Sequence, residues 1–370
     1  MIYLDNAATT KPKKEAVDAV INCAENFGNP SSLHGLGLSA EKIITECKEK
    51  TAKILGVEPK NIYFTSGGTE SNNTAILGYA RANKKTGLHL ITTKIEHPSV
   101  LEPFHILEKE GFSVTYLSCD KSGKISLEEF ENALRDDTIL VSAMLVNNET
   151  GTVLPIDKMK AIMKQKAKKA VLHTDAVQGF LKTDINLKKM GVDMMSASGH
   201  KIHALKGTGI LYIKDGVKIL PIIAGGGQQK NMRSGTENVP GIAAFSAAVS
   251  SFSPINPSVC KSFKNKILEK IPDVKINGGD ENFGYILNVS FLGVKAEILL
   301  HSLESHKIYV STGSACSSNK PMPSHVLTAM GCTKKEIEGA VRFSFSEEFD
   351  EDFVIEKLAQ EVKNIRKYVR

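Results

Sequence analysis

Residues 62–72, Ile-Tyr-Phe-Thr-Ser-Gly-Gly-Thr-Glu-Ser-Asn, decide the fold class of this chain. The first four residues are apolar or of types common in strands, and they predict a short strand. The two glycines and the polar residues after them are typical of a turn into a helix. Glycines in such a turn let backbone N–H groups approach an anion, and the helix dipole favours negative charge there. The stretch therefore predicts either a phosphate-binding turn or an ordinary turn in which Thr69 caps the helix.

Apolar runs and amphipathic helical segments alternate on either side of this stretch. We predict strands at residues 88–92, 114–117, 138–146, 170–174, 194–197 and 209–213, with helices such as 101–110 and 126–134 between them. Alternation of this kind is typical of an α/β protein with a mainly parallel sheet covered by helices on both faces.

A change in composition near residues 250–258 predicts a domain boundary. Residues 251–258 are rich in Pro and Ser and follow a helix of small residues at 241–249. Beyond them we expect a helix from about Lys261, strands near 286–291 and 341–345, and a last helix from Glu351. We predict a large domain at 15–250 and a smaller α+β domain formed by 1–14 and 251–370.

The composition is that of a globular protein with a slightly basic surface. Of 370 residues, 41% are hydrophobic, and the net charge is only +6. With 6% aromatic residues and no basic-aromatic cluster, we expect no direct nucleic-acid partner. The N-terminus has no signal-peptide pattern and no apolar run approaches the ~18 residues that span a bilayer, so we expect a cytoplasmic protein without a membrane partner.

The cysteines lack the spacing of a metal site, and one of them stands apart. None of the six lies in a CxxC pair or in a zinc-finger pattern, so we expect free thiols and no metal in the isolated protein. Five are interpreted as small buried side chains. Cys316 instead lies among small polar residues at 311–321, which favours an exposed reactive thiol on a loop at about 311–322, although an incidental loop cysteine fits the same pattern.

Two predicted strands end in residues suited to a cofactor with an aldehyde. Lys201 follows the strand at 194–197 in Ser-Gly-His-Lys, and strand ends of this kind bind ligands in open α/β sheets. A lysine amine forms a Schiff base with an aldehyde. Asp175 ends the preceding strand, where an acid either caps a helix or pairs with a pyridine nitrogen, and Gln178 lies within reach of the same place.

Two further segments add side chains to this predicted pocket. His97 follows a strand, and it is either structural or placed to stack on a flat ring and transfer protons. Asn148 lies in Asn-Asn-Glu-Thr-Gly at 147–151, where another buried strand ends in amide donors.

In order and spacing, these motifs resemble the cysteine desulfurases of the NifS/IscS-like group, within the class V aminotransferase superfamily. The resemblance runs nearly end to end, through DNAATT at 5–10, GNPSS at 28–32, TSGGTES at 65–71, EH at 96–97, NNETG at 147–151, HTDAVQ at 173–178, SGHK at 198–201, RSGT at 233–236, GSAC at 313–316 and VRFS at 341–344. It implies the fold-type I architecture of pyridoxal 5'-phosphate (PLP) enzymes and a small domain that carries the catalytic-cysteine loop.

The resemblance also implies a role for each matching residue. Lys201 would bind the PLP aldehyde, Asp175 would pair with the ring nitrogen, and His97 would stack on the ring. Asn148 and Arg342 would bind the substrate carboxylate, for which arginine's planar fork is suited. The PLP phosphate and ring hydroxyl would be held by Gly68, Thr69, Ser198, His200, Gln178 and, from the partner subunit of a homodimer, Thr236.

The activity implied is removal of sulfur from L-cysteine, which leaves L-alanine and a persulfide on Cys316. The sulfur acceptor stays open between an iron–sulfur scaffold protein, for which Cys316 is also a candidate transient cluster ligand, and a tRNA-thiolation enzyme. A selenocysteine lyase or another class V aminotransferase is the alternative, since neither needs Cys316. A non-catalytic homologue is disfavoured because Lys201, Asp175 and Cys316 are all present.

Overall fold

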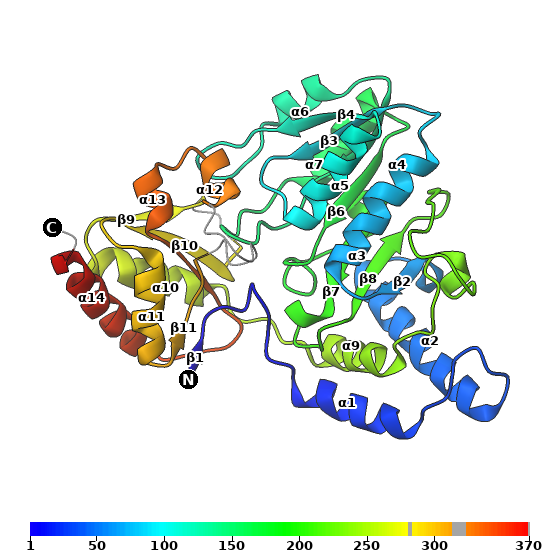
Figure 1. Ribbon diagram of the computed structural model, residues 1–370, viewed down its shortest axis with the longest axis horizontal. Coiled ribbons are helices and arrows are strands. Elements are labelled where there is room, and N and C mark those ends of the chain that lie inside the picture. The colour runs from blue at the N-terminus through cyan, green and yellow to red at the C-terminus, as the bar shows by residue number, and fades with distance from the viewer. Residues whose placement is uncertain (280–282, 313–322, 369–370) are drawn as a thin grey trace.

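The computed structural model describes residues 1–279, 283–312 and 323–368, which form two lobes (Figure 1). The strands of the large lobe are β2 (Ile62–Thr65), β3 (His89–Thr93), β4 (Ser113–Leu117), β5 (Thr138–Ser142), β6 (Val171–Asp175), β7 (Met194–Ser198) and β8 (Gly209–Ile213). Its helices are α1 (Lys14–Glu25), α2 (Gly35–Leu55), α3 (Gly68–Asn73), α4 (Tyr79–Ala82), α5 (Pro98–Lys109), α6 (Leu127–Ala133), α7 (Ile156–Lys166), α8 (Leu187–Met190) and α9 (Val239–Ser251).

The small lobe is built from the two ends of the chain. Its strands are β1 (Ile2–Tyr3), β9 (Val274–Asn277), β10 (Ile286–Phe291), β11 (Ile308–Tyr309) and β12 (Ala340–Ser344). Its helices are α10 (Ser258–Lys270), α11 (Ala296–Ser305), α12 (His325–Ala329), α13 (Lys334–Glu338) and α14 (Glu351–Tyr368). The division into domains at 15–250 and 251–370 stays a prediction.

The sheet of the large lobe has seven strands in the order β2-β8-β7-β6-β5-β3-β4. All of its pairs are parallel except those of β8, which runs antiparallel to β2 and to β7. The predicted mainly parallel sheet is therefore correct. The strand predicted at 138–146 is too long, because β5 ends at Ser142, although Ala143 and Leu145 still donate to carbonyls of β6.

Neighbouring residues of the central strands face opposite sides of this sheet, as the pleat requires. Leu90, Leu140 and Met194 pack with residues of the π-helical turn Thr74–Gly78, α4 and α5 on one face. Ile91, Val141 and Met195, each one position later, belong to the core that contains residues of α2, α7 and α9. Because both faces are covered, the central strands read as nearly continuous apolar runs, and that is why the sequence reveals them.

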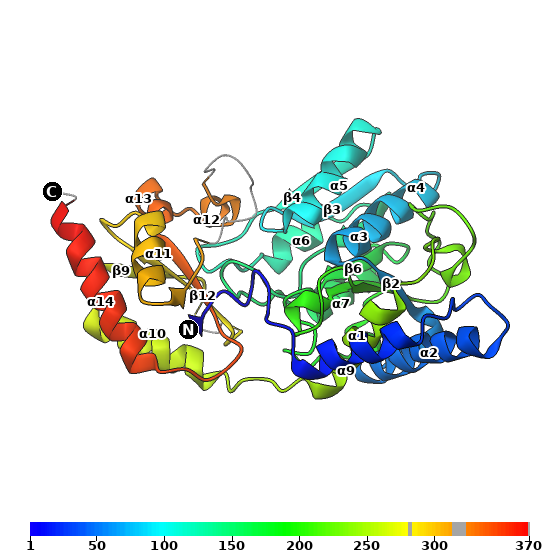
Figure 2. The same cartoon turned by 60° about the horizontal axis from the view of Figure 1, so that its bottom comes forward.

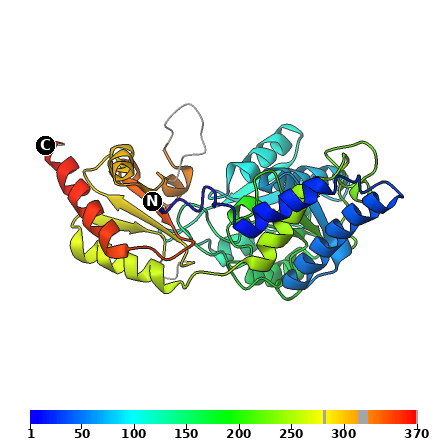
Figure 3. The ribbon, with the colours of Figure 1, turned by 90° about the horizontal axis from the view of Figure 1, so that it is seen from below.

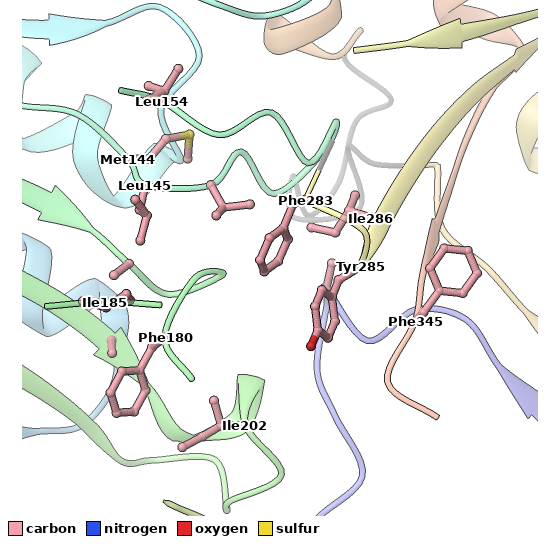
Figure 4. Close-up of a cluster of buried hydrophobic side chains, with 14 of the residues drawn as sticks. Met144, Leu145, Leu154, Phe180, Ile185, Ile202, Phe283, Tyr285, Ile286 and Phe345 are labelled. Carbon is pink, nitrogen blue, oxygen red and sulfur yellow. The ribbon is translucent and has the colours of Figure 1, made fainter. Parts of the chain in front are cut away.

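The small lobe is an antiparallel sheet, in the order β12-β10-β9, against which α10, α11 and α14 pack (Figure 3). The N-terminal segment runs from this lobe to α1 in the large lobe and passes between the two (Figure 2). The lobes also share an apolar cluster in which Phe283 and Ile286 lie between Leu145 and Phe345 (Figure 4). Among the described residues, no helix combines the length and apolarity that a bilayer crossing requires.

Candidate active site

A pocket of about 200 Å³ lies where β6 and β7 end, at the junction of the two lobes. Its walls come from the N-terminal segment, the turn before α3, the ends of β6 and β7, and β12. The lining residues are Ala7, Ala8, Gly68, Thr69, His97, Ser99, Met144, Val146, Asn148, Asp175, Val177, Gln178, Ser198, His200, Lys201 and Arg342. The structure thus brings together all the site residues predicted from the sequence except Thr236 and Cys316.

Asp175 and Gln178 are buried on one wall of the pocket. The two carboxylate oxygens of Asp175 accept hydrogen bonds from Asn72 Nδ2 at 2.7 Å and from the backbone N–H of Val177 at 2.9 Å. Gln178 Nε2 donates to the carbonyl of Ala7 at 2.9 Å, while its Oε1 is buried and has no hydrogen-bond partner. The pocket therefore holds a fixed carboxylate beside an acceptor left for a ligand.

Lys201 lies in the short 3₁₀ turn Gly199–Lys201 that directly follows β7. Its Nζ donates to the carbonyl oxygens of Ala7 and Ala8, at 2.5 and 2.6 Å. The neighbouring His200 has its Nδ1 3.1 Å from Thr9 Oγ1. Burial and the positive charge of Lys201 lower the pKa of His200 to about 4, so its imidazole is neutral at pH 7.

The glycine turn leads into the helix as expected, but its cap differs from the sequence interpretation. Gly67 is the N-cap residue of α3 and Thr69 is the second helical residue, so the alternative in which Thr69 caps the helix is wrong. A Cβ atom added at Gly68 would lie 2.7 Å from Val177 Cγ2. The pocket wall therefore has no room for a side chain at Gly68, which brings the backbone close to the cavity.

His97 caps the N-terminus of α5, where its Nδ1 accepts from the backbone N–H of Ser99 at 3.1 Å. Burial lowers the pKa of His97; the charge of Asp175 opposes this effect, and those of Lys201 and His325 add to it. A largely neutral imidazole at pH 7 is able to accept a proton.

Two buried acids behind the pocket were missed by the sequence analysis. Glu96 accepts from the hydroxyl of Thr93 and from the N–H of Met144, and burial raises its pKa to about 8. Burial also raises the pKa of Glu149, which accepts a hydrogen bond from Ser324. Glu96 directly precedes His97, and Glu149 directly follows Asn148. The sequence around each acid carries no signal that its side chain turns inward.

Arg342 on β12 closes the pocket from the small lobe and is 4% exposed. Its Nη1 donates to the carbonyl of Asn148 at 2.9 Å, and its Nη2 donates to Asp5 Oδ1 at 2.8 Å. Its Nε is buried without a partner. The N-terminal residues Asp5, Ala7 and Ala8 contact Arg342, Lys201 and Gln178. They belong to the motif at 5–10, and the sequence predicted no role for them.

Thr236 and Cys316 lie elsewhere. Thr236 is exposed and does not line the pocket of its own chain. It follows Arg233, whose Nε pairs with Glu70 Oε1 at 3.0 Å on the helix that begins at the glycine turn. Cys316 lies outside the described residues.

The residues of the pocket fit PLP. Asp175 supplies a buried negative charge for a pyridinium nitrogen, the open Oε1 of Gln178 suits a ring hydroxyl, and Lys201 supplies an amine for the aldehyde. The turn at Gly68 offers backbone N–H groups to a phosphate. Fold and site together define the class: a PLP-dependent enzyme of fold type I.

Comparison with known proteins identifies the family. Residues 2–354 match the family "Aminotransferase class-V", and the chain belongs to that family. It is 44% identical to a cysteine desulfurase IscS of Methanosarcina thermophila, over 99% of this chain and 93% of the relative. It is 41% identical to a putative cysteine desulfurase, IscS 1, of Bacillus subtilis, over 100% of this chain and 97% of the relative.

Solved structures agree with these relatives. A NifS-like protein superposes with a TM-score of 0.88 at 37% identity, covering 99% of this chain and 98% of that one. The structure named "SspA in complex with cysteine" superposes with a TM-score of 0.85 at 36% identity, covering 94% and 99%. The resemblance read from the sequence, the fold type and the dependence on PLP are confirmed, and the chain groups with the cysteine desulfurases.

Proposed function

We propose that this chain removes sulfur from L-cysteine and holds it as a persulfide on Cys316. The observation that carries the proposal is the convergence of Lys201, Asp175 and Arg342 on one pocket. These groups supply an amine for an aldehyde, a counter-charge for a pyridinium ring and a cation for an amino-acid carboxylate.

The chain on both sides of Cys316 supports a role for its thiol at this pocket. Ser311 exchanges backbone hydrogen bonds with Arg342, at 3.2 and 2.7 Å, and Ser324 donates to Glu149, next to Asn148. Cys316 follows Ser311 by five residues. Five extended residues span at most about 18 Å, which sets an upper limit on the distance between Ser311 and Cys316.

The other cysteines are poor candidates for the nucleophile. A thiolate, not a thiol, attacks sulfur. Burial raises the pKa of every cysteine that the structure describes, to about 11 for Cys119, about 12 for Cys47 and Cys260, and by a smaller amount for Cys23 and Cys332.

In this proposal the pocket residues divide the work. PLP, when bound, supplies an aldehyde that joins the substrate amine and a ring that takes up electrons from its α-carbon. Gly68, Thr69, Ser198 and His200 would hold the phosphate, together with Thr236 from the partner subunit. Asp175 and Gln178 would hold the ring with His97 beside it, and Asn148 and Arg342 would bind the carboxylate.

Lys201 and Cys316 carry out the chemistry on the substrate. Lys201 moves a proton at the α-carbon, and the carbonyls of Ala7 and Ala8 accept hydrogen bonds from its amine. The Cys316 thiolate attacks the substrate sulfur, so that a sulfur–sulfur bond forms as the carbon–sulfur bond breaks. The electron pair of the broken bond stays with carbon, and protonation gives alanine.

The test is release of alanine and sulfide from L-cysteine in the presence of a thiol reductant. We expect C316A and K201A both to lose turnover, while C316A keeps the visible absorbance of bound PLP and K201A changes it. C332A, which removes a half-buried thiol elsewhere, is the matched control and should stay active. Full activity of C316A on cysteine would show that the persulfide role is wrong and favour a lyase or a transaminase.

The biological setting extends the same proposal. We infer a cytoplasmic homodimer, in which Thr236, exposed and absent from the lining of this pocket in its own chain, reaches the partner's site. The relatives named IscS favour an iron–sulfur scaffold as the sulfur acceptor, with tRNA thiolation as the second candidate. Transfer of labelled sulfur from Cys316 to purified proteins of each kind distinguishes them.

A further inference from the structure

The N-terminal segment is fixed against the strand that carries Arg342. Leu4 and Asn6 bond to the backbone of β11 and β12, and the N–H of Ala7 donates to Ser344 Oγ at 2.8 Å. Asn6 Nδ2 adds a bond to the carbonyl of Ser344 at 2.9 Å. Asp5 therefore approaches Arg342 from backbone that is held on both sides, and its carboxylate has little freedom to move.

Three groups of the Arg342 guanidinium have distinct surroundings. Asn148 O and Asp5 Oδ1 accept from Nη1 and Nη2, at 2.9 and 2.8 Å, and Nε is buried without a partner. Arg342 lines the pocket, and its Nε–H is a donor for which the protein supplies no acceptor.

We propose that Asp5 is a positioning residue for the substrate carboxylate, because its hydrogen bond with Nη2, together with that of Asn148 O with Nη1, fixes the plane of the Arg342 guanidinium at the pocket wall. This inference rests on the proposed role of Arg342 in the desulfurase. A planar fork recognises a carboxylate well only in the correct orientation. The carbonyl of Asn148 alone leaves the guanidinium free to turn about one hydrogen bond.

Asp5 also brings a negative charge near the binding site, and that charge opposes a substrate carboxylate. Orientation and charge therefore predict opposite effects when Asp5 is changed. Aspartate-to-asparagine substitution removes the charge and keeps an Oδ1 acceptor in place, whereas alanine removes both. If orientation dominates, D5A weakens cysteine binding and D5N restores most of it.

The experiment measures KM and kcat of the holoenzyme for L-cysteine, and binding of cysteamine, which lacks the carboxylate, by the visible absorbance of bound PLP. We expect D5A to raise KM by about tenfold or more, the effect of losing a hydrogen bond to a charged group, with kcat within about twofold. Cysteamine binding should change by less than about twofold, since Asp5 acts only through the carboxylate contact. D136N, at the exposed turn before β5, is the control for loss of one negative charge.

The outcomes for the variants distinguish a failure of this inference from a failure of the proposed function on which it rests. If R342Q leaves the KM for cysteine unchanged, the proposed role of Arg342 fails and the inference falls with it. If R342Q raises KM but D5A does not, only the role of Asp5 is overturned. An equal loss of cysteamine and cysteine binding in D5A also overturns the role of Asp5, because it indicates a general structural defect. A D5N variant as impaired as D5A overturns it as well, because it indicates that the charge of Asp5 matters and not the orientation of Arg342.

Discussion

At the scale of single residues, Glu96 is a group whose ionisation the fold suppresses. It is fully buried beside His97, and its pKa is raised to about 8 by burial. In the unfolded chain a glutamate ionises near pH 4.3. Between these two pH values the unfolded state loses its proton and the folded state keeps it, so ionisation favours unfolding and stability falls as pH rises.

Glu96→Gln should remove this dependence, because the amide is neutral at every pH. We expect the free energy of unfolding of the wild type to fall by up to about 1.4 kcal/mol per pH unit relative to E96Q between pH 5 and 8. Urea titrations at several pH values measure the difference, with E41Q, an exposed acid on α2, as the control. Parallel pH curves for wild type and E96Q would contradict the protonated state of Glu96.

The sequence reveals the residues of this site only where chemistry and position coincide. Lys201 and Asp175 could be predicted because each stands out at the end of an apolar run. Asp5 could not be assigned a role, because its partner Arg342 is 337 positions away. Glu96 looked like part of a loop, and only the fold shows that its side chain turns inward.

At the scale of elements, the glycine turn depends on β8, the reversed strand beside it. Gly209 begins β8 and pairs with Thr65 and Ser198 on its two neighbours. A Cβ atom added at Gly209 would lie 2.6 Å from the Cα of Gly67. Backbone on that side cannot move without shifting the turn that leads into α3.

Gly209→Ala should therefore lower stability by about 1–3 kcal/mol, the usual effect of overpacking, and weaken PLP binding as well. Urea unfolding and the PLP retained after dialysis measure the two effects. Gly35→Ala is the matched control, since nothing lies within 4 Å of a Cβ atom there and the position begins helix α2. An unchanged PLP affinity in G209A would show that the turn adapts independently of β8.

The long buried strands, the reversed β8 among them, could be predicted, and the two-residue strands could not. Strands β3, β5, β6 and β7 are buried on both faces, so their sequences are rich in apolar residues, whereas the edge strand β4 is only partly buried. The strands β1 and β11 have two residues each, too few for any periodicity to appear. The strand β5 was predicted too long because Ala143, Met144, Leu145 and Val146 are buried like strand residues, and Ala143 and Leu145 still donate to carbonyls of β6, although the regular strand ends at Ser142.

At the scale of the whole molecule, the site is assembled from both lobes. Asp175 and Lys201 come from the large lobe, and Arg342 comes from the small lobe. Between the lobes run the N-terminal segment and the apolar cluster of Figure 4. Local sequence patterns could predict each lobe's elements, but the contact of residues 2–7 with 307–344 has no local signature.

The interface between the lobes should control substrate binding more than PLP binding. Phe283 is nearly buried, stacks on Tyr285 with ring centroids 4.8 Å apart, and its N–H donates to the carbonyl of Gly151 in the large lobe at 3.1 Å. Phe283→Ala removes apolar contact from this interface, at a cost of about 3–5 kcal/mol if the lobes do not close the cavity. The residues proposed to hold PLP come almost entirely from the large lobe, whereas Arg342 depends on how the small lobe docks.

We therefore expect F283A to retain PLP but to raise the KM for L-cysteine. The thermal transition in calorimetry should broaden or split, because the lobes no longer unfold as one unit. Phe353→Ala, on the exposed side of α14, provides the control for loss of a phenyl ring. Should F283A lose PLP as readily as cysteine, the small lobe would have to support the cofactor too. In that case the division of labour between the lobes, with one holding the ring and the other the carboxylate, would be wrong.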